Sequence, residues 1–370
     1  MNLLEYNEVR NYQYDRKCFD FSPCIAPYNN IYFSVDGTCA PCWQTIGRVD
    51  KWSKNRSIKD IWTGEKFKFY RENLKNKIFL GECKICENNI DNDIWPLALA
   101  YDKFGLNDEW PTLMELELSN QCNLECIMCS GKLSSGIRKN RDKLPPLPMI
   151  YDDSFVEQLR EFIPHLEELR FNGGEPLAQK IVFDICDIVS VLKPELKINI
   201  ATNGTVYNQP VKNLLEKCNI HLNISIDSLV KEKYESIRIN GDFNLLMDNV
   251  KKFHKYLKMD NKNEFSIMVN PMRNNWEEMP NYVEFTIKND AYLWYNTIRY
   301  PLHLSIWNLP AEELKNIYEV LRTRTLQLEI EYKETSQWQT LDHLVNNQIK
   351  GWLDNQLLNV SSGIEVEFYE

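Results

Sequence analysis

The sequence predicts an α/β protein whose centre is an incomplete (β/α)6 barrel with a polar lumen. Three observations predict this class: strand–helix alternation starts near residue 112, nine of the 11 cysteines precede residue 130, and helical stretches follow residue 310. A small irregular cysteine-rich domain therefore precedes the barrel, and C-terminal helices follow it. Repeated strand–helix units favour a parallel sheet with right-handed crossovers. Six units suffice for an incomplete barrel and are too few for the eight-fold one.

The individual elements follow from short strands that are each succeeded by a helical stretch. We expect strands at 112–118, 167–172, 196–202, 220–226, 264–270 and about 300–307. We expect barrel helices near 153–162, 179–192, 209–217, 243–257 and 275–288. One earlier helix is expected in SIKDIWTGEKFKFYRENLKNK, and two later ones at 310–325 and 335–349. The predicted domains are therefore 1–105 (cysteine-rich), 106–310 (barrel) and 311–370 (C-terminal helices).

Several of these strands alternate apolar and polar residues, although strands of a parallel sheet are usually apolar on both faces. If the apolar face packs against the outer helices, the polar side chains point into the barrel. The side chains placed there are Glu115, Glu117, Asn223, Ser225, Asp227, Ser266, Asn270, His303 and Ser305. A filled barrel would carry Val, Ile and Leu at such positions, so this lumen is expected to hold water or a polar ligand.

The composition excludes several classes of protein. The formal net charge is −10, and an acidic chain is a poor general binder of nucleic acid. No apolar run approaches the roughly 18 residues that a membrane span needs. The N-terminal residues lack the basic start and apolar stretch of a signal peptide. We therefore expect a cytoplasmic protein without a membrane or nucleic-acid partner.

Sulfur is the anomaly of the composition, with 11 Cys against only 5 His. In a reducing compartment, grouped thiols are typical of metal ligands or catalytic groups rather than of disulfides. Cys122, Cys126 and Cys129 follow the first barrel strand with C-x3-C-x2-C spacing. Three thiolates in one loop can hold a four-iron cluster and leave one iron open for a small molecule. A structural zinc site short of one ligand, or three chance thiols, is the alternative interpretation.

This loop resembles the cluster loop of the radical S-adenosylmethionine (radical SAM) superfamily, in which an aromatic residue often stands where this chain has Met128. One strand–helix unit later, Gly173-Gly174-Glu175-Pro176 matches the superfamily's GGEP turn. The resemblance implies that this edge binds the methionine part of S-adenosylmethionine. It also implies cosubstrate contacts by Asn203, Ser225, Asp227, Arg238 and Asn270.

The N-terminal cysteines allow two ligand sets. Two C-x2-C pairs, Cys39/Cys42 and Cys83/Cys86, fit a closed tetrahedral zinc ribbon. The set Cys24, Cys42, Cys83 and Cys86 instead resembles the SPASM and twitch modules, whose ligands hold a second four-iron cluster. Such a module usually follows the barrel, whereas here it precedes it. On this second interpretation Cys39 and Cys18 are spare, and Cys186 and Cys218 are buried inert thiols.

Together the resemblances imply an enzyme with two [4Fe–4S] clusters and S-adenosylmethionine. Such an enzyme cleaves S-adenosylmethionine reductively to a 5′-deoxyadenosyl radical, which abstracts hydrogen from a substrate. The resemblance favours a peptide substrate, with a small metabolite as the alternative, and a reducing partner such as flavodoxin or ferredoxin. The alternative of another class is a zinc-binding adaptor without turnover. A polar lumen and a GGEP edge argue against the adaptor, which needs neither.

Overall fold

The computed structural model describes residues 6–10, 22–45, 49–91, 99–107, 109–257 and 264–361. Within it the chain forms two compact units. The first comprises Met1–Cys122, Gly131–Ile200 and Asn208–Ile220, and the second comprises Asn123–Ser130, Ala201–Tyr207 and His221–Glu370. Cys18, one of the two expected spare thiols, lies outside the described residues.

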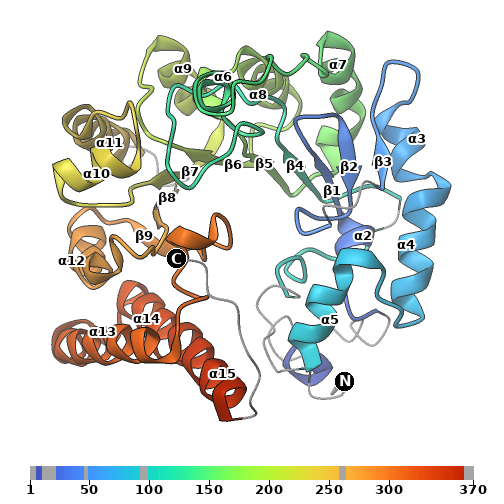
Figure 1. Cartoon of the computed structure of the whole chain (residues 1–370). Helices are drawn as coiled ribbons and strands as arrows, with labels where there is room; N and C mark the ends of the chain where they lie inside the picture. The colour runs from blue at the N-terminus through green and yellow to red at the C-terminus, as the bar shows by residue number, and fades with distance from the viewer. Residues whose placement is uncertain are drawn as a thin grey trace. The chain divides into compact units, whose positions relative to one another are not determined.

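The first unit is built on a mixed sheet in the order β3-β2-β1-β4-β5-β6 (Figure 1). Its strands are β1 (Asn30–Phe33), β2 (Thr38–Ala40), β3 (Asp50–Lys51), β4 (Leu113–Leu116), β5 (Glu168–Phe171) and β6 (Lys197–Thr202). β1 and β2 form an antiparallel hairpin, whereas β1, β4, β5 and β6 pair in parallel. The cysteine-rich segment therefore contributes strands to the same sheet as the first barrel strands.

The helices of the first unit lie before and after the cysteine loop in the sequence. They are α2 (Ala26–Asn29), α3 (Ile58–Trp62), α4 (Glu65–Lys75), α5 (Lys84–Asp91), α6 (Ser135–Asn140), α7 (Asp153–Phe162), α8 (Lys180–Leu192) and α9 (Gln209–Lys217). Short 3₁₀ turns occupy η2 (Gly81–Cys83), η3 (Ile163–His165) and η4 (Pro176–Ala178).

The single helix expected near residues 57–77 is two helices, α3 and α4. Ser57 caps α3 in a capping box with Asp60, because each side chain accepts from the other residue's backbone N–H. The break falls at Thr63 and Gly64. A Cβ on Gly64 would lie 2.5 Å from the Asp60 carbonyl oxygen, so only glycine fits where the chain turns into α4.

The second unit carries β7 (Asn219–Ser225), β8 (Glu264–Val269) and β9 (Tyr292–Tyr295), which pair in parallel in that order. Its helices are α10 (Lys231–Ile237), α11 (Phe243–Leu257), α12 (Asn281–Lys288), α13 (Ala311–Tyr332), α14 (Ser336–Asp342) and α15 (Lys350–Ser361). Its other turns are η5 (Trp276–Glu278), η6 (Leu302–Leu304) and the π-helix η7 (His343–Ile349). In Figure 1 the helix α14 lies beside β9 and α12, and α13 packs against α14.

The mostly parallel α/β class is confirmed, but the strand expected near 300–307 is wrong. That stretch begins with Pro301 and forms the short turn η6, and the last strand is β9. Proline has no backbone N–H to give to a sheet, which disfavours a strand there. His303 is consequently exposed and Ser305 buried in a turn, so neither belongs to a barrel strand. The expected helix 310–325 extends to Tyr332, and 335–349 is part of a longer helical run to Ser361.

Among the described residues, none of the helices combines the length and the apolar character needed to cross a lipid bilayer.

The polar face of β4 and β5 is an ion-pair network rather than an open polar wall. The Glu115 carboxylate accepts from Asn30 Nδ2 at 2.9 Å, from the Tyr101 hydroxyl at 2.7 Å and from Arg170 Nη1 at 3.0 Å. Arg170 Nε also donates to Glu168 at 2.6 Å. These partners come from β1, β4 and β5 and from the loop that precedes β4. The network therefore connects the β1–β2 hairpin to β4 and β5.

Glu168 is the most strongly paired carboxylate of this network. Its side chain is 3% exposed, and Lys103 Nζ lies 2.8 Å from it in addition to Arg170. Burial raises the pKa of Glu168, but the charges of Arg170 and Lys103 outweigh it and lower that pKa to about 2. The carboxylate is thus ionised at any physiological pH.

We expect Glu168→Gln to lower the free energy of unfolding by about 3 kcal/mol at pH 7, because it leaves the Lys103 cation without its counter-charge and Arg170 with the Glu115 carboxylate alone. Glu157→Gln is the matched control, since Glu157 is 69% exposed beside Arg160 and such a pair contributes less than about 0.5 kcal/mol. Urea unfolding under anaerobic conditions measures both. The lowered pKa contributes stability above the unfolded glutamate pKa of about 4.3. The difference from wild type should therefore persist to about pH 5 and fade as the pH falls toward 2. A difference that grows on acidification would contradict this assignment.

Candidate functional site

Four N-terminal thiols from three stretches of chain meet in apolar surroundings. Cys24, Cys83 and Cys86 pack against one cluster of buried residues, formed by Tyr6, Leu74, Phe79 and Ile90. Cys24 and Cys42 pack against a second cluster, formed by Ala26, Tyr101, Phe104 and Leu113. Because Cys24 belongs to both groups, the four sulfur atoms share one region of the first unit.

The electrostatics of these thiols agree with their grouping. Burial raises the pKa of Cys24, and Cys42, Cys86 and Cys83 raise it further. Burial likewise raises the pKa of Cys42 to about 12, although a hydrogen bond from Thr45 acts in the opposite direction. The thiols of Cys24 and Cys42 are therefore neutral on their own. A metal cation is the partner that would stabilise several buried thiolates together.

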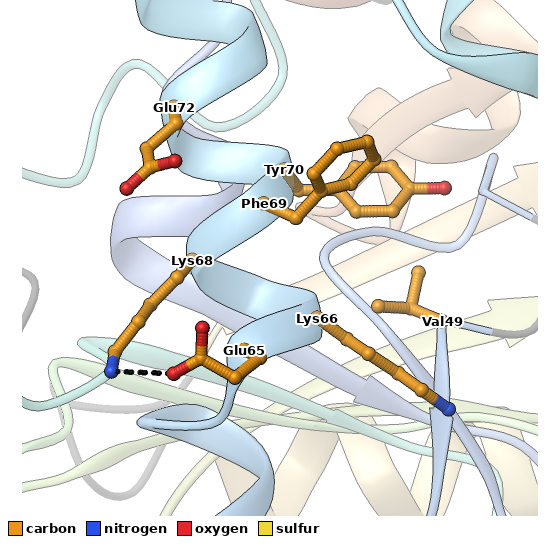
Figure 2. Close-up of a pocket in the computed structure, with 7 residues that line it drawn as sticks. All are labelled: Val49, Glu65, Lys66, Lys68, Phe69, Tyr70 and Glu72. Atoms are coloured by element: carbon orange, nitrogen blue, oxygen red, sulfur yellow. Dashed lines mark hydrogen bonds and ion pairs between the residues drawn. The ribbon is translucent and has the colours of Figure 1, made fainter.

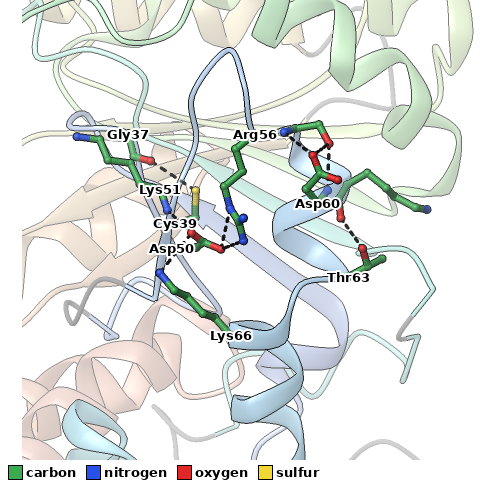
Figure 3. A network of polar contacts seen from close by, with 10 residues as sticks. Gly37, Cys39, Asp50, Lys51, Arg56, Asp60, Thr63 and Lys66 are labelled. Atoms are coloured by element: carbon green, nitrogen blue, oxygen red, sulfur yellow. Dashed lines mark hydrogen bonds and ion pairs between the residues drawn. The ribbon is translucent and has the colours of Figure 1, made fainter.

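Cys39 lies in a different environment (Figure 3). Its sulfur is buried at the β1–β2 hairpin and lies 3.5 Å from the Gly37 carbonyl oxygen. Its charged neighbours are Asp50 and Arg56, which form an ion pair with each other. Neither of the two clusters that contact the other four thiols contains Cys39. The set brought together is thus Cys24, Cys42, Cys83 and Cys86.

A cavity of about 600 Å³ opens over α4 (Figure 2). It is lined by Val49, Glu65, Lys66, Lys68, Phe69, Tyr70 and Glu72. Burial raises the pKa of Tyr70 to about 12, and the nearby Cys83, Glu82 and Cys42 contribute to the shift. Tyr70 therefore lines the cavity and is also within electrostatic range of Cys83 and Cys42.

Cys122, in the first unit, begins the C-x3-C-x2-C loop directly after β4. Its backbone N–H donates to the Ser135 hydroxyl at 3.4 Å, and the GGEP turn supports the residue before it. The Glu175 N–H donates to the Gln121 carbonyl oxygen at 2.8 Å. A Cβ on Gly174 would lie 2.5 Å from that same oxygen, and its φ is +56°. Glycine is required at Gly174 because the cysteine loop itself occupies the space beside it.

The other residues of the turn are also held by the chain. Gly173 has a φ of +75°, and an added Cβ would lie 2.9 Å from the Glu117 side chain. Glu175 is fully buried, and its carboxylate accepts from the Leu177 N–H at the start of η4, where Pro176 takes the first position. The GGEP turn thus forms a rigid support under the loop.

Cys126 and Cys129 belong to the second unit, where the loop pairs with the segment after α10. The N–H of Glu125 donates to the Ile239 carbonyl and that of Ile127 to the Ile237 carbonyl, both at 2.9 Å. Arg238 lies between those two acceptors, and its Nη1 approaches the Cys126 sulfur to 3.8 Å. Burial raises the pKa of the Cys126 thiol, whereas the Arg238 charge lowers it.

Arg238 is fixed in turn by Asp227, the residue that closes the β7 edge. The guanidinium donates to the Asp227 carboxylate from Nε at 2.8 Å and from Nη2 at 2.7 Å. The other Asp227 oxygen accepts from Asn270 through its backbone N–H and its side chain, both at 2.9 Å. Asn275 donates to the carbonyls of Asp227 and Asn270. Asp227, Arg238 and Asn270, each chosen from the sequence, thus form one network with Cys126.

Asn203 and Ser225 complete the polar residues named from the sequence. Asn203 is buried, donates from Nδ2 to Asn123 Oδ1 at 2.9 Å and accepts from the Thr205 hydroxyl at 2.7 Å. Asn123 follows Cys122 directly, so Asn203 holds the loop as Arg238 does. Ser225 is the half-buried last residue of β7.

The fit to iron–sulfur clusters rests on donor chemistry. Among the described residues, no three Cys, His, Asp or Glu side chains already stand in the arrangement of a metal site. The candidate donors are all sulfur, which suits iron–sulfur clusters and zinc and not the hard cations Mg²⁺ and Ca²⁺. A sulfur-only set of three in one loop and of four in another region therefore fits two clusters. Cys122, Cys126 and Cys129 would hold the first, and Cys24, Cys42, Cys83 and Cys86 the second.

Comparison with known families agrees with both regions. The radical SAM superfamily model matches residues 116–286, which include the cysteine loop and the GGEP turn. The SPASM iron-sulfur cluster-binding domain matches residues 24–87, which begin at Cys24 and end just after Cys86. The chain is a radical SAM enzyme with an N-terminal SPASM domain. The [4Fe–4S] cluster and S-adenosylmethionine that the first requires, and the auxiliary cluster of the second, are therefore its cofactors.

Curated relatives of this radical SAM enzyme share one printed name. The mitochondrial GTP 3',8-cyclase of Arabidopsis thaliana is 32% identical over 147 residues, which are 39% of this chain and 35% of the relative. The probable GTP 3',8-cyclase of Methanocaldococcus jannaschii is 25% identical over 277 residues, which are 72% of this chain and 78% of the relative. The matches thus span about a third of the plant enzyme and 44% of a Clostridium perfringens one.

Two solved structures are also similar. Native anSMEcpe with bound AdoMet has a TM-score of 0.43 and 20% identity, over 58% of this chain and 62% of that one. Streptococcus suis SuiB bound to precursor peptide SuiA has a TM-score of 0.44 and 15% identity, over 67% of this chain and 60% of that one.

Three residues that hold these regions were not found from the sequence. Thr45 and Tyr101 contact the Cys42 environment, and Asn123 binds Asn203. Asn123 lies within the cysteine motif, where its position next to Cys122 could have marked it. Thr45 and Tyr101 carry no such signal, because scattered Thr and Tyr are ordinary core residues.

The two N-terminal ligand sets differ in one residue, and we expect Cys24→Ala and Cys39→Ala to separate them. Cys24→Ala should lose about four irons per chain, because a four-iron cluster normally takes four thiolates. Cys39→Ala is the matched control and should keep them, since Cys39 lies apart from the other thiols. Iron, sulfide and zinc analysis of anaerobically purified protein measures both. Full iron in Cys24→Ala, or zinc released only by Cys39→Ala, would contradict this ligand set.

Proposed function

We propose that the chain cleaves S-adenosylmethionine reductively at a cluster held by Cys122, Cys126 and Cys129 and uses the product to take hydrogen from a substrate. The observation that carries this proposal is the Cys126–Arg238–Asp227 arrangement in the second unit. A cysteine motif alone could bind zinc. The buried Arg238 guanidinium faces the Cys126 thiol and is held by the Asp227 carboxylate. A positive charge is therefore fixed beside that sulfur.

In this reaction the protein would hold the cysteine loop in place and balance the negative charge of its thiolates. A reduced four-iron cluster, when bound, supplies the electron that cleaves S-adenosylmethionine and so starts hydrogen abstraction. Arg238 offsets the negative charge of the Cys126 thiolate, and Asp227 keeps the guanidinium from turning away. Asn203 and the GGEP turn fix the loop from their own sides. Each of these groups is held by hydrogen bonds within the chain, and donors fixed in this way stabilise charge at little cost of reorganisation.

We further propose that cosubstrate contacts come from the strand ends named from the sequence. Gly173, Gly174, Glu175 and Pro176 would offer backbone groups to the methionine part. Ser225, Asp227 and Asn270 would offer polar atoms on the β7–β8 edge, with Asn203 as a further contact. Because the Arg238 side chain is engaged by Asp227 and Cys126, its contribution to a bound carboxylate would be the charge it shares with them.

The second cluster would serve substrate holding or electron disposal. Hydrogen abstraction followed by bond formation leaves one electron to remove from the product, and a buried cluster is a suitable acceptor. The ligands Cys24, Cys42, Cys83 and Cys86 lie in the same unit as Tyr101 and Glu115, whose side chains are hydrogen-bonded at 2.7 Å. This contact connects the thiol region with the polar face of β4.

The substrate of this reaction would be either a peptide or a small metabolite. Family resemblance favours a peptide, which would gain a crosslink, an epimerised centre or an oxidised side chain. The relatives named GTP 3',8-cyclase support a small metabolite instead. An exposed aromatic pair suits either class: Tyr292 is 47% and Trp294 55% exposed, on the face of β9 opposite the buried Leu293. Flat rings of a side chain or a nucleobase can stack on such a surface.

The reaction needs a source of single electrons and a reducing compartment. The ten cysteines that the structure describes form no disulfide with one another, which suits a reducing compartment such as the cytoplasm. We therefore propose a cytoplasmic enzyme that takes electrons from a partner such as flavodoxin or ferredoxin.

The test is a triple variant, Cys122→Ala with Cys126→Ala and Cys129→Ala. We expect the formation of 5′-deoxyadenosine under dithionite to be abolished, because the three thiolates are the whole protein ligand set. The matched control replaces three other buried thiols, Cys39, Cys186 and Cys218, by Ala and should keep the activity. Liquid chromatography of the nucleoside measures both. Undiminished formation in the first triple variant would overturn the proposed function.

A further inference from the structure

A strongly basic segment follows the cysteine loop of an otherwise acidic chain. Residues 131–143 contain Lys132, Arg138, Lys139, Arg141 and Lys143, and the only acidic residue among them is Asp142. The whole chain, by contrast, has 53 acidic and 43 basic residues and a net charge of −10. We call residues 131–143 the basic collar.

The basic collar is attached to Cys122 by hydrogen bonds. The Ser135 backbone N–H donates to the Asn120 carbonyl at 2.7 Å, and Asn120 Nδ2 donates to the Gly131 carbonyl at 3.1 Å. The Ser135 hydroxyl accepts from the Cys122 N–H. The collar is therefore held firmly against the start of the cysteine loop.

A cavity of about 420 Å³ joins the basic collar to Cys122. Cys122 lines it together with Arg138 and Lys139, and the apolar Leu144, Pro146 and Leu147 form its other side. The surface around it is accessible: Lys132 is 49%, Arg141 46% and Leu144 48% exposed. A cationic rim with an apolar centre is the composition of a protein-binding surface.

We infer that the basic collar is the docking surface for an acidic one-electron donor protein. This inference rests on the proposed function, in which Cys122 ligates a cluster that must be reduced. In the step concerned the donor's reduced flavin or iron–sulfur centre loses one electron and the cluster gains it, with no proton or atom transferred. The surface suits this occupant because its charge is opposite to that of an acidic donor and it adjoins a cluster ligand.

An electron-donor surface makes a specific kinetic prediction. Rim charges act mainly on the association rate and on its salt dependence, with effects of about 10-fold to 10³-fold. Once the cluster has been reduced, the rate of turnover no longer depends on the charges of the basic collar. Donor-supported turnover and turnover after complete chemical reduction should therefore respond differently to charge reversal.

The experiment compares Lys139→Glu/Lys143→Glu with the matched control Lys251→Glu/Lys255→Glu on α11. The probe is flavodoxin kept reduced by its NADPH-dependent reductase, and the readout is the initial rate of 5′-deoxyadenosine formation. We expect at least about a 10-fold lower donor-supported rate for the collar variant at low salt, and a wild-type rate that falls as salt is added. The control should match wild type.

A single turnover after full prior reduction with dithionite is the internal check. It should be equal in wild type and both variants. Equal donor-supported rates in all three proteins would overturn the docking surface. So would a collar variant that also fails after prior reduction, because the collar would then serve the cluster itself. A wild-type protein that forms no 5′-deoxyadenosine after prior reduction would overturn the proposed function first.

A second inference concerns Thr45 and rests on different contacts. Thr45 is buried, and its hydroxyl oxygen lies 3.0 Å from the Cys42 sulfur, while its N–H donates to the Cys42 carbonyl. The Thr45 hydroxyl thus contacts one of the four grouped thiols directly.

We infer that Thr45 is a positioning residue that sets the reduction potential of the auxiliary cluster. A thiolate has no proton, so the Thr45 hydroxyl must donate to the Cys42 sulfur once Cys42 is a ligand. Hydrogen bonds to cluster sulfurs stabilise the more negative, reduced state and raise the potential.

Thr45→Val removes the hydroxyl and keeps the shape, whereas Thr45→Ser keeps the hydroxyl. A potential titration followed by electron paramagnetic resonance should show a more negative auxiliary cluster in Thr45→Val and a near-native one in Thr45→Ser, at equal iron content. Equal potentials in wild type and Thr45→Val would overturn this role, as would loss of iron in both variants. A wild-type protein without auxiliary iron would instead overturn the ligand set.

Discussion

Burial of sulfur is the constraint on which the N-terminal half of the molecule depends. Cys24, Cys42, Cys83 and Cys86 come from three separate stretches of chain, and each packs against apolar side chains. Buried thiols contribute little as donors to one another, so a metal is the group that would join these stretches firmly. The hairpin β1–β2 carries Cys42 at its end and also pairs with β4. The metal region and the barrel sheet are consequently one structure in the first unit.

The radical SAM loop is held in place differently, by contacts that other segments make with a backbone carbonyl and a thiol of the loop. Gly174 leaves room for the Gln121 carbonyl, and the Glu175 N–H binds it. In the second unit Arg238 faces the Cys126 sulfur, with Asp227 behind it. These supports come from different strand ends, which explains why motifs far apart in the sequence belong to one function.

The sequence predicted the cofactors better than the arrangement of the strands. The cysteine spacing and the family resemblance together led to the two proposed donor sets, and Asp227, Arg238 and Asn270 proved to form one network with Cys126. β1 and β2 were missed because strands of four and three residues show too little alternation. The alternating pattern at 302–306 wrongly predicted a strand, because Pro301 has no backbone N–H to donate to a sheet. The strand that pairs with β8 is β9. Thr45 and Tyr101 act through tertiary contacts that no local pattern records.

The central claim is that one chain carries two sulfur-ligated clusters of different kinds. Mössbauer spectroscopy of protein reconstituted with ⁵⁷Fe tests it most directly, before and after S-adenosylmethionine is added. We expect about eight irons per chain in two [4Fe–4S] clusters, with one iron of one cluster changed by S-adenosylmethionine and the other cluster unchanged. About four irons per chain, or a spectrum that S-adenosylmethionine leaves unaltered, would contradict it.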